Sequence, residues 1–431
     1  MEKLTKYLYV VSFDGLSVLD FDYISTLPNF KSYLEDAAYS KHVYSIYPSL
    51  TYPAYATIVT GKYPKNHGVI NNTLQQINRD SPDWYWQRKY INGETLYDLA
   101  IDNGMSVASL LWPVTAKSRI QYNLPEIFAN RPWQNQILVS LLNGSPMYQY
   151  KLNKKFGHLR KGLSQPNLDN FTHASLLNTI EEKDVKLTLV HYTDLDSMRH
   201  KHGFYCLEAK DALDRFDIRL GELINALKNK GIYEKSTLVV LGDHSSIDEH
   251  KIINLNVLLK EKGHIKVIKS IILSYKAIVK TCDGSAYVYV KEEELIEEIK
   301  DVIQNFNKKE NCIDNIYTTI EAEKLGADPK CSLMLEAKKG YYFLDSLEGP
   351  IIKQIKPGEA ELVSKVTAST HGYSPFKENY TTVFMAAGKG INKGNIIKEM
   401  NLIDEGPTLA ALLGLQFKKC DGNIIKEFLI R

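Results

Sequence analysis

Short apolar runs that end on polar residues recur along this chain, with helical patterns between them. The runs span residues 7–13, 106–111, 186–192 and 236–241, and three of them lead directly to aspartates. Strands that are apolar almost throughout are typical of a parallel sheet covered on both faces. The pattern predicts an α/β fold with a doubly wound, mostly parallel sheet flanked by helices.

The pattern changes between residues 265 and 365. A strand-like run at 286–290 precedes a helical stripe of Leu295, Ile299, Val302 and Phe306, and two further strand-like runs follow. Such a mixture is typical of a small α+β unit. We therefore expect residues 1–264 and 366–431 to form the catalytic core and residues 265–365 an inserted α+β subdomain.

Charge and cysteine content exclude one class of partner and two kinds of cysteine site. The 53 Lys and Arg residues nearly balance the 51 Asp and Glu residues, which gives a net charge of +2. Proteins that bind polymeric nucleic acid neutralise many phosphates, so we expect no such partner here. The five cysteines are scattered without a CxxC pair, which argues against a disulfide scaffold and a thiolate metal site.

Targeting signals are not evident. Residues 1–6 run straight into the first apolar strand without the longer apolar stretch of a secretory signal. No run approaches the roughly 18 apolar residues that span a bilayer. We expect a cytoplasmic protein with no membrane partner, and the sequence predicts no oligomeric state.

Carboxylates and imidazoles gather where the predicted strands end. Asp14, Asp196 and the adjacent pair Asp243 and His244 each follow a strand closely. The carboxyl ends of strands form the ligand-binding edge of an open α/β sheet. His200 lies four residues after Asp196, on the same face of a helical turn. Such ligands suit zinc or another divalent first-row metal.

Thr51 is the candidate nucleophile. Pro53 suits a first helical turn and Gly61 a helix end, so Thr51 is expected at the start of a helix. Free backbone N–H groups and the positive end of the dipole make that position suitable for an anion. An ordinary helix cap is the alternative reading of this threonine.

These motifs together resemble the nucleotide pyrophosphatase/phosphodiesterase family of the alkaline phosphatase superfamily. The resemblance runs from residues 10–15 to the Thr-His-Gly-Tyr segment at 370–373 and covers most of the chain. It implies an alkaline phosphatase-like fold with two zinc ions, other divalent first-row metals being possible. It assigns Asp14, Thr51, Asp243 and His244 to one ion, and Asp196, His200 and His371 to the other.

The resemblance also implies a mechanism. Thr51 would attack phosphorus to form a phosphothreonine intermediate, and Asn72 would donate a hydrogen bond to a phosphoryl oxygen. Tyr52 follows the nucleophile where family members place an aromatic ring against a nucleobase, with simple packing as the alternative. Residues 58–61, 63–64 and 67–68 match the family's continuation of the nucleophile helix.

Departures from the family pattern leave substrate preference open. Arg199 replaces the usual glycine before His200, Ser245 replaces a glycine after His244, and Ala54-Tyr55 replaces Asn-His. After Thr51 no Lys or Arg occurs until Lys62, which favours a substrate with an uncharged second substituent. Arg199 and Lys117 are the cations that other loops could bring to the phosphoryl group.

The implied activity is hydrolysis of phosphodiester or pyrophosphate bonds in a small phosphate ester or nucleotide. Three alternatives remain open from sequence. One is a phosphonate hydrolase of the phosphonoacetate type, another is a phosphate monoesterase, and the third is an inactive nucleotide-binding protein.

Overall fold

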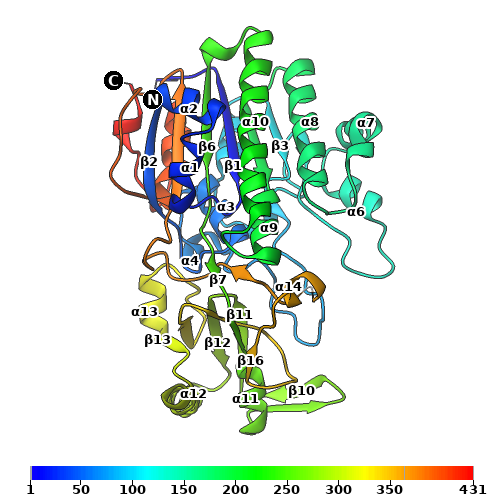
Figure 1. Ribbon diagram of the computed structural model, residues 1–431, viewed down its shortest axis with the longest axis vertical. Coiled ribbons are helices and arrows are strands. Elements are labelled where there is room, and N and C mark those ends of the chain that lie inside the picture. The colour runs from blue at the N-terminus through cyan, green and yellow to red at the C-terminus, as the bar shows by residue number, and fades with distance from the viewer. Residues whose placement is uncertain (1, 364, 431) are drawn as a thin grey trace.

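The computed structural model describes residues 2–363 and 365–430, with a large sheet at its centre (Figure 1). The sheet has eight strands in the order β19-β2-β18-β6-β1-β5-β3-β4. Its strands are β1 (Tyr7–Phe13), β2 (Ala37–Tyr44), β3 (Val107–Leu110), β4 (Tyr122–Leu124), β5 (Leu187–Tyr192), β6 (Ser236–Leu241), β18 (Thr382–Gly388) and β19 (Met400–Asn401). β1 is parallel to β5 and β6, whereas β18 is antiparallel to β2 and β6. The predicted mostly parallel sheet is confirmed.

Helices cover both faces of this sheet. Because successive strand residues point to opposite sides, Leu8 and Val10 enter one apolar core while Tyr9 and Val11 enter the other. The first core includes residues of α3 (Thr51–Thr60), α5 (Leu96–Asp102) and α15 (Glu405–Leu412). The second includes residues of α2 (Pro28–Glu35), α8 (Asn167–Glu182) and α10 (Leu207–Asn229). This is the doubly wound arrangement that the apolar strands predict.

The remaining helices and short strands of this body lie around the sheet. They are α1 (Phe21–Ile24), α4 (Pro64–His67), α6 (Gln136–Asn143), α7 (Pro146–Phe156), α9 (Asp194–His202), α14 (Glu359–Leu362), β7 (Ile247–Asp248) and β17 (Ser369–Thr370). Among the described residues, no helix has both the length and the apolar character needed to cross a membrane.

A smaller lobe lies beyond the carboxyl ends of the parallel strands (Figure 1). Its centre is an antiparallel sheet in the order β11-β12-β14-β13. The lobe contains β9 (Ile265–Ile268), β10 (Ile271–Tyr275), β11 (Ala277–Cys282), β12 (Ser285–Val290), α12 (Ile296–Glu310), β13 (Ile313–Thr318), α13 (Thr319–Lys324), β14 (Leu333–Ala337), β15 (Tyr341–Phe343) and β16 (Ile352–Gln354). In addition, β8 (Lys251–Ile253) pairs with β15 and β16, and α11 (Leu255–Glu261) contacts β9 and β11. The chain therefore enters this lobe before residue 265, the expected boundary.

Helix α3 begins at Thr51, where the sequence places a helix start, and Leu50 is its N-cap. It ends at Gly61, which has a φ of 63° in the left-handed region. Segment 63–68 does not continue it. Tyr63 precedes a separate short helix, α4, because Gly61 has already ended the hydrogen-bonded turns of α3.

Gly372 lies where the core and the smaller lobe approach each other. Its φ is +86°, and a Cβ atom there would lie 1.8 Å from the carbonyl oxygen of Cys282. Gly263 has a similar φ of +80° but open space around it. Alanine substitutions at these two glycines can therefore distinguish the cost of backbone strain from the cost of a steric clash.

We expect Gly372→Ala to destabilise the protein by about 3 kcal/mol or more, as strain and overpacking add. Gly263→Ala, the matched control, carries strain alone and is expected to cost about 1 kcal/mol. Urea unfolding of both variants measures the difference. Equal losses would show that the contact with Cys282 is unimportant.

Candidate metal-dependent active site

The candidate site lies at the carboxyl edge of the large sheet. Asp14 directly follows β1, and Asp243 and His244 lie just beyond the end of β6. Asp196 lies in the first turn of α9, after β5. The amino end of α3 brings Thr51 to the same place. The parallel strands thus gather side chains that are far apart in the sequence.

The first group of side chains is centred on His244. Its Nε2 lies 3.2 Å from Thr51 Oγ1, 3.4 Å from Asp14 Oδ1 and 3.1 Å from Asp243 Oδ2. Ligands at 2.0–2.2 Å around a tetrahedral zinc ion are separated by about 3.3 Å. Ligand atoms of Asp14, Asp243 and His244 also lie within 4.8 Å of one another, so these three residues suit a single cation, with Thr51 beside them.

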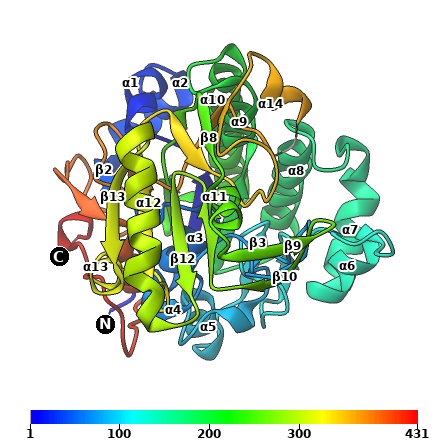
Figure 2. The same cartoon turned by 90° about the horizontal axis from the view of Figure 1, so that it is seen from below.

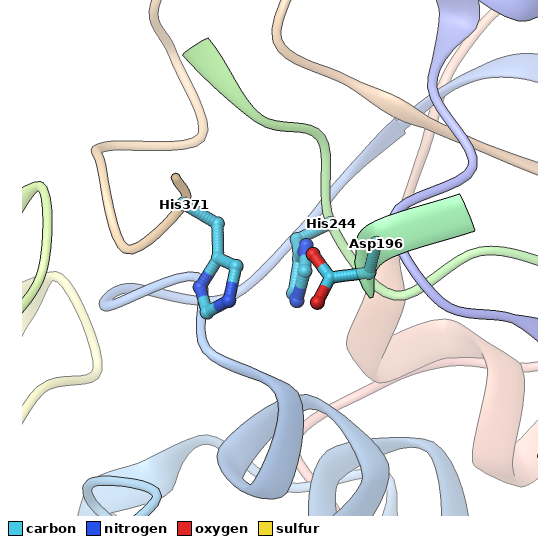
Figure 3. A group of neighbouring side chains, drawn as sticks. All are labelled: Asp196, His244 and His371. Carbon is cyan, nitrogen blue, oxygen red and sulfur yellow. The ribbon is translucent and has the colours of Figure 1, made fainter. Parts of the chain in front are cut away.

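The second group brings in His371, which follows the smaller lobe in the sequence. Ligand atoms of Asp196, His244 and His371 lie within 4.8 Å of one another, and Figure 3 shows these side chains facing each other. The ring of His371 stacks on that of His244 with centroids 3.9 Å apart. His244 therefore lies between the two groups.

His200 contacts the second group from one side. Its Nε2 lies 3.0 Å from Asp196 Oδ2, and its Nδ1 lies 2.9 Å from the carbonyl oxygen of Ser369. Since a carbonyl accepts only from N–H, Nδ1 carries a proton, and a cation would bind Nε2 in place of the proton that the Asp196 carboxylate favours there. The compact second group contains His244 rather than His200, and the assignment of His200 to a metal stays a prediction.

Buried polar atoms without partners show that the site suits a cation. Asp14 Oδ1, Asp196 Oδ1, Asp243 Oδ2 and His371 Nδ1 are buried and make no hydrogen bond among the described residues. Leaving such atoms unsatisfied is costly, and most buried polar groups do have partners. Because all are oxygen or imidazole nitrogen donors, a divalent metal fits this set.

The pKa values reflect the crowding of like charges. Burial raises the pKa of Asp14 to about 7, and the carboxylates of Asp243 and Asp196 add to this shift. Burial likewise raises the pKa of Asp243 to about 7. Burial lowers the pKa of His200, but the Asp196 carboxylate outweighs it and raises the value to about 9. Protons thus compete with a cation for these side chains.

Two further residues contact the candidate site and are not among the residues predicted from sequence. His191 Nε2 lies 3.1 Å from Asp14 Oδ2, and its Nδ1 lies 3.2 Å from Glu126 Oε2. His191 therefore holds Asp14 Oδ2 and leaves Oδ1 facing the first group. The only available signal was a histidine within the otherwise apolar run of β5. Asp283 reaches the site from the smaller lobe, with Oδ2 4.0 Å from His371 Nδ1.

A cavity of about 910 Å³ opens over the two groups. Both lobes line it, and its walls include Thr51 and Asn72 from the core and Asp283 from the smaller lobe. Trp84 and Phe128 supply an aromatic wall with ring centroids 5.5 Å apart. A cavity of this size accommodates a nucleotide-sized molecule.

Asn72 has a defined orientation in this cavity. Its Oδ1 accepts a hydrogen bond of 2.9 Å from the backbone N–H of Tyr52. The other end of the amide is therefore the NH₂ group, which can donate to a ligand. This orientation suits the phosphoryl-binding role expected of Asn72, which stays a prediction.

Tyr52 lies outside the cavity. Its side chain is fully buried, and it is not among the residues that line the cavity. The ring packs edge-on against Trp84 with centroids 5.2 Å apart. Trp84 thus lies in the position to contact a ligand, and Tyr52 supports it from behind, as in the packing alternative.

The two cations considered from sequence do not enter the cavity. Arg199 is buried, its Nη2 lies 2.6 Å from Asp20 Oδ1, and its Nη1 donates to the carbonyl oxygen of Gly15. Lys117 is exposed and does not line the cavity. The basic residues that do line it are Arg160 and Lys365, together with His200 and His371.

Fold and site together define a metal-dependent hydrolase with the alkaline phosphatase-like fold. Murine ectonucleotide pyrophosphatase/phosphodiesterase 5 has a similar structure, with a TM-score of 0.69 at 19% identity over 98% of this chain and 100% of that chain. An inactive threonine-to-alanine variant of that protein, in complex with AMP, has the same TM-score of 0.69. The shared fold includes both lobes, given this coverage.

The family is shown by a family model described as type I phosphodiesterase / nucleotide pyrophosphatase, which matches residues 8–374. The chain belongs to this family and is a hydrolase of the phosphodiesterase class. Bovine bis(5′-adenosyl)-triphosphatase ENPP4 is 21% identical over 95% of this chain and 78% of its own. Mouse ectonucleotide pyrophosphatase/phosphodiesterase family member 7 is 21% identical over 96% of this chain and 85% of its own.

We expect Asp14 and Asp243 to contribute less to the thermal stability of the metal-free protein as the pH rises from about 4 to about 7. In that interval the folded Asp14 and Asp243 retain protons that the unfolded chain releases, so folding is favoured less at higher pH. A bound cation replaces these protons, and its stabilising effect should grow over the same interval.

Melting temperatures in EDTA and in excess zinc chloride, between about pH 5 and pH 8, test this expectation. The gap between the two conditions should widen as the pH rises. Asp243→Asn should flatten the pH dependence in EDTA because one titrating group is removed. A difference in melting temperature that stays constant with pH would show that Asp14 and Asp243 are not protonated in the folded, metal-free protein.

Proposed function

We propose that this protein hydrolyses phosphodiester or pyrophosphate bonds of nucleotide-type substrates at two zinc ions, through a phosphothreonine formed on Thr51. The observation that carries the proposal is the position of Thr51 Oγ1, 3.2 Å from His244 Nε2 and within the first group of metal-suited side chains. A threonine hydroxyl becomes a competent nucleophile only where its proton is lost readily.

In this proposal Asp14, Asp243, His244 and Thr51 hold one cation, and Asp196, His200 and His371 hold the other. The bound cations would supply Lewis-acid stabilisation of the attacking and leaving oxygens and lower the pKa of the Thr51 hydroxyl. His191 supports this arrangement because it keeps one carboxylate oxygen of Asp14 occupied.

The chain's own groups would position the phosphoryl group. Thr51 Oγ1 would form a bond to phosphorus as the bond to the leaving oxygen breaks, and water would then cleave the Thr51 phosphoester. The amide NH₂ of Asn72 would donate to one non-bridging oxygen. The N–H of Thr51, in the first turn of α3 and without an intrahelical partner, is placed to donate to another.

The walls of the cavity support a substrate with a planar group beyond the phosphate. Trp84 and Phe128 face this space, and aromatic rings are suited to packing against a nucleobase. The bovine relative is named for a dinucleoside triphosphate, and the murine structure contains AMP. Both names support a nucleotide-type substrate for this chain.

We expect Thr51→Ala to lower turnover of bis-p-nitrophenyl phosphate by at least about a thousandfold while retaining bound metal. The substitution removes the attacking oxygen but leaves Asp14, Asp243 and His244 in place. Thr51→Ser should retain part of the activity because it keeps a hydroxyl.

Thr60→Ala is the matched control, since Thr60 lies in the same helix and its hydroxyl donates to the carbonyl oxygen of Ala56. It should turn over substrate like the unmodified protein. Wild-type turnover by a folded Thr51→Ala variant would disprove the nucleophile assignment.

We expect a preference for diesters over monoesters. A monoester carries an additional charge, and neither Arg199 nor Lys117 is placed to meet it. The kcat/KM of the p-nitrophenyl ester of thymidine 5′-monophosphate should exceed that of p-nitrophenyl phosphate by about tenfold or more, roughly 1.4 kcal/mol.

The same assay separates the other candidate activities. Preference for p-nitrophenyl phosphate would contradict the proposal and indicate that Arg160 or Lys365 serves the phosphoryl group. Release of phosphate from phosphonoacetate would indicate the phosphonate hydrolase.

A further inference from the structure

Helix α6 exposes its apolar side. Ile137, Leu138 and Leu142 are 59%, 58% and 74% exposed, and α6 has no fully buried residue. With 3.6 residues per turn, these three side chains and Leu141 lie on one continuous face. A surface helix normally exposes its polar face to water, whereas α6 exposes its apolar face.

Specific hydrogen bonds hold α6 in this orientation. Gln136 accepts from the backbone N–H of Ala129 at 2.7 Å and donates to the carbonyl oxygen of Ile127 at 3.0 Å. Ser140 donates to Gln149 Oε1 at 2.8 Å. The polar side of α6 is thus attached to the body of the protein, and its apolar side points away.

Neighbouring elements carry further exposed apolar side chains. Trp133 precedes α6 and is 81% exposed, Met147 and Tyr150 lie on α7, and Leu163 lies in the loop before α8. α6 and α7 lie at one edge of the molecule, beyond α8 (Figure 2). We call these exposed side chains the α6–α7 patch: Trp133, Ile137, Leu138, Leu142, Met147, Tyr150 and Leu163.

The chain segment that carries the patch contains basic but no acidic residues. From Ile127 to Leu168 the chain contains no Asp or Glu. Lys151 and Lys154 share the outward face of α7 with Met147 and Tyr150, and Lys161 lies in the loop near Leu163. These three lysines are exposed and form no ion pair with a described residue. Lys155, in contrast, pairs with Glu182.

We propose that the α6–α7 patch docks onto an anionic lipid bilayer. Apolar side chains with an aromatic ring and unpaired lysines are the combination that lies in a membrane interface, where the rings enter the acyl boundary and the lysines meet lipid phosphates. In a symmetric pair of this chain, lysines around the patch would face lysines of the other copy. Charge complementarity therefore favours an anionic surface over a second copy.

The patch is continuous with the candidate active site. Ile137 and Leu163 belong to the patch and also line the cavity over the metal-suited groups. Docking would consequently place the mouth of the cavity close to the lipid surface. The expectation of no membrane partner was based on the lack of a spanning segment, which a protein that lies on a bilayer does not need.

Vesicle flotation of the full-length protein tests the proposal. The probes are vesicles of phosphatidylglycerol mixed with phosphatidylcholine, and vesicles of phosphatidylcholine alone. We expect binding to the anionic vesicles that weakens with added salt, and at least tenfold weaker binding to the neutral ones. The fluorescence of Trp133 should shift to shorter wavelength on binding, and Trp133→Phe should abolish this shift.

Two sets of substitutions separate the apolar and charged contributions. Leu138→Asp with Leu142→Asp, and separately Lys151→Gln with Lys154→Gln and Lys161→Gln, should each lower binding at least tenfold. Ile320→Asp with Leu362→Asp is the control for the first set, as both side chains are highly exposed elsewhere. Lys262→Gln with Lys308→Gln and Lys309→Gln is the control for the second.

None of the substituted residues lines the cavity. Hydrolysis of bis-p-nitrophenyl phosphate therefore reports on the folding of each variant independently of lipid binding. Equal binding of unmodified and patch variants would overturn the proposal, as would binding to neither type of vesicle. Sedimentation without lipid that shows a dimer dissociated by Leu138→Asp with Leu142→Asp would assign the patch to self-association and also overturn it.

Discussion

The candidate active site depends on the burial of three carboxylates around one imidazole. Asp14 and Asp243 flank His244, and Asp196 lies on its other side, all shielded from water. Such a concentration of negative charge is unfavourable in a protein interior unless cations or protons balance it. The ends of the sheet strands, the helix termini and the smaller lobe together enclose these side chains.

Much of this arrangement was predictable because it depends on local order in the sequence. An apolar strand followed by a polar residue indicates both a buried strand and a position at the edge of a parallel sheet. This rule brought Asp14 and Asp243 to one place, and the Pro53–Gly61 pattern placed the start of α3 at Thr51. The family resemblance then supplied the roles that spacing alone left open.

The features that escaped prediction depend on contacts between distant segments. Tyr52 is turned into the core because Trp84, from a separate loop, covers it. His191 lies within a buried strand, and its contact with Asp14 exists only after β1 and β5 pair. The outward face of α6 reverses the usual pattern, so hydrophobic periodicity does not indicate how this helix is oriented.

The position of His371 has a consequence for biosynthesis. Its ring completes the second group only after the whole smaller lobe, inserted between His244 and this residue, has been made. Contacts of such long sequence separation form late and carry a large cost in chain entropy. A nascent chain that has emerged only through His244 contains Thr51 and the three aspartates yet lacks His371, so the second group is completed only late in translation.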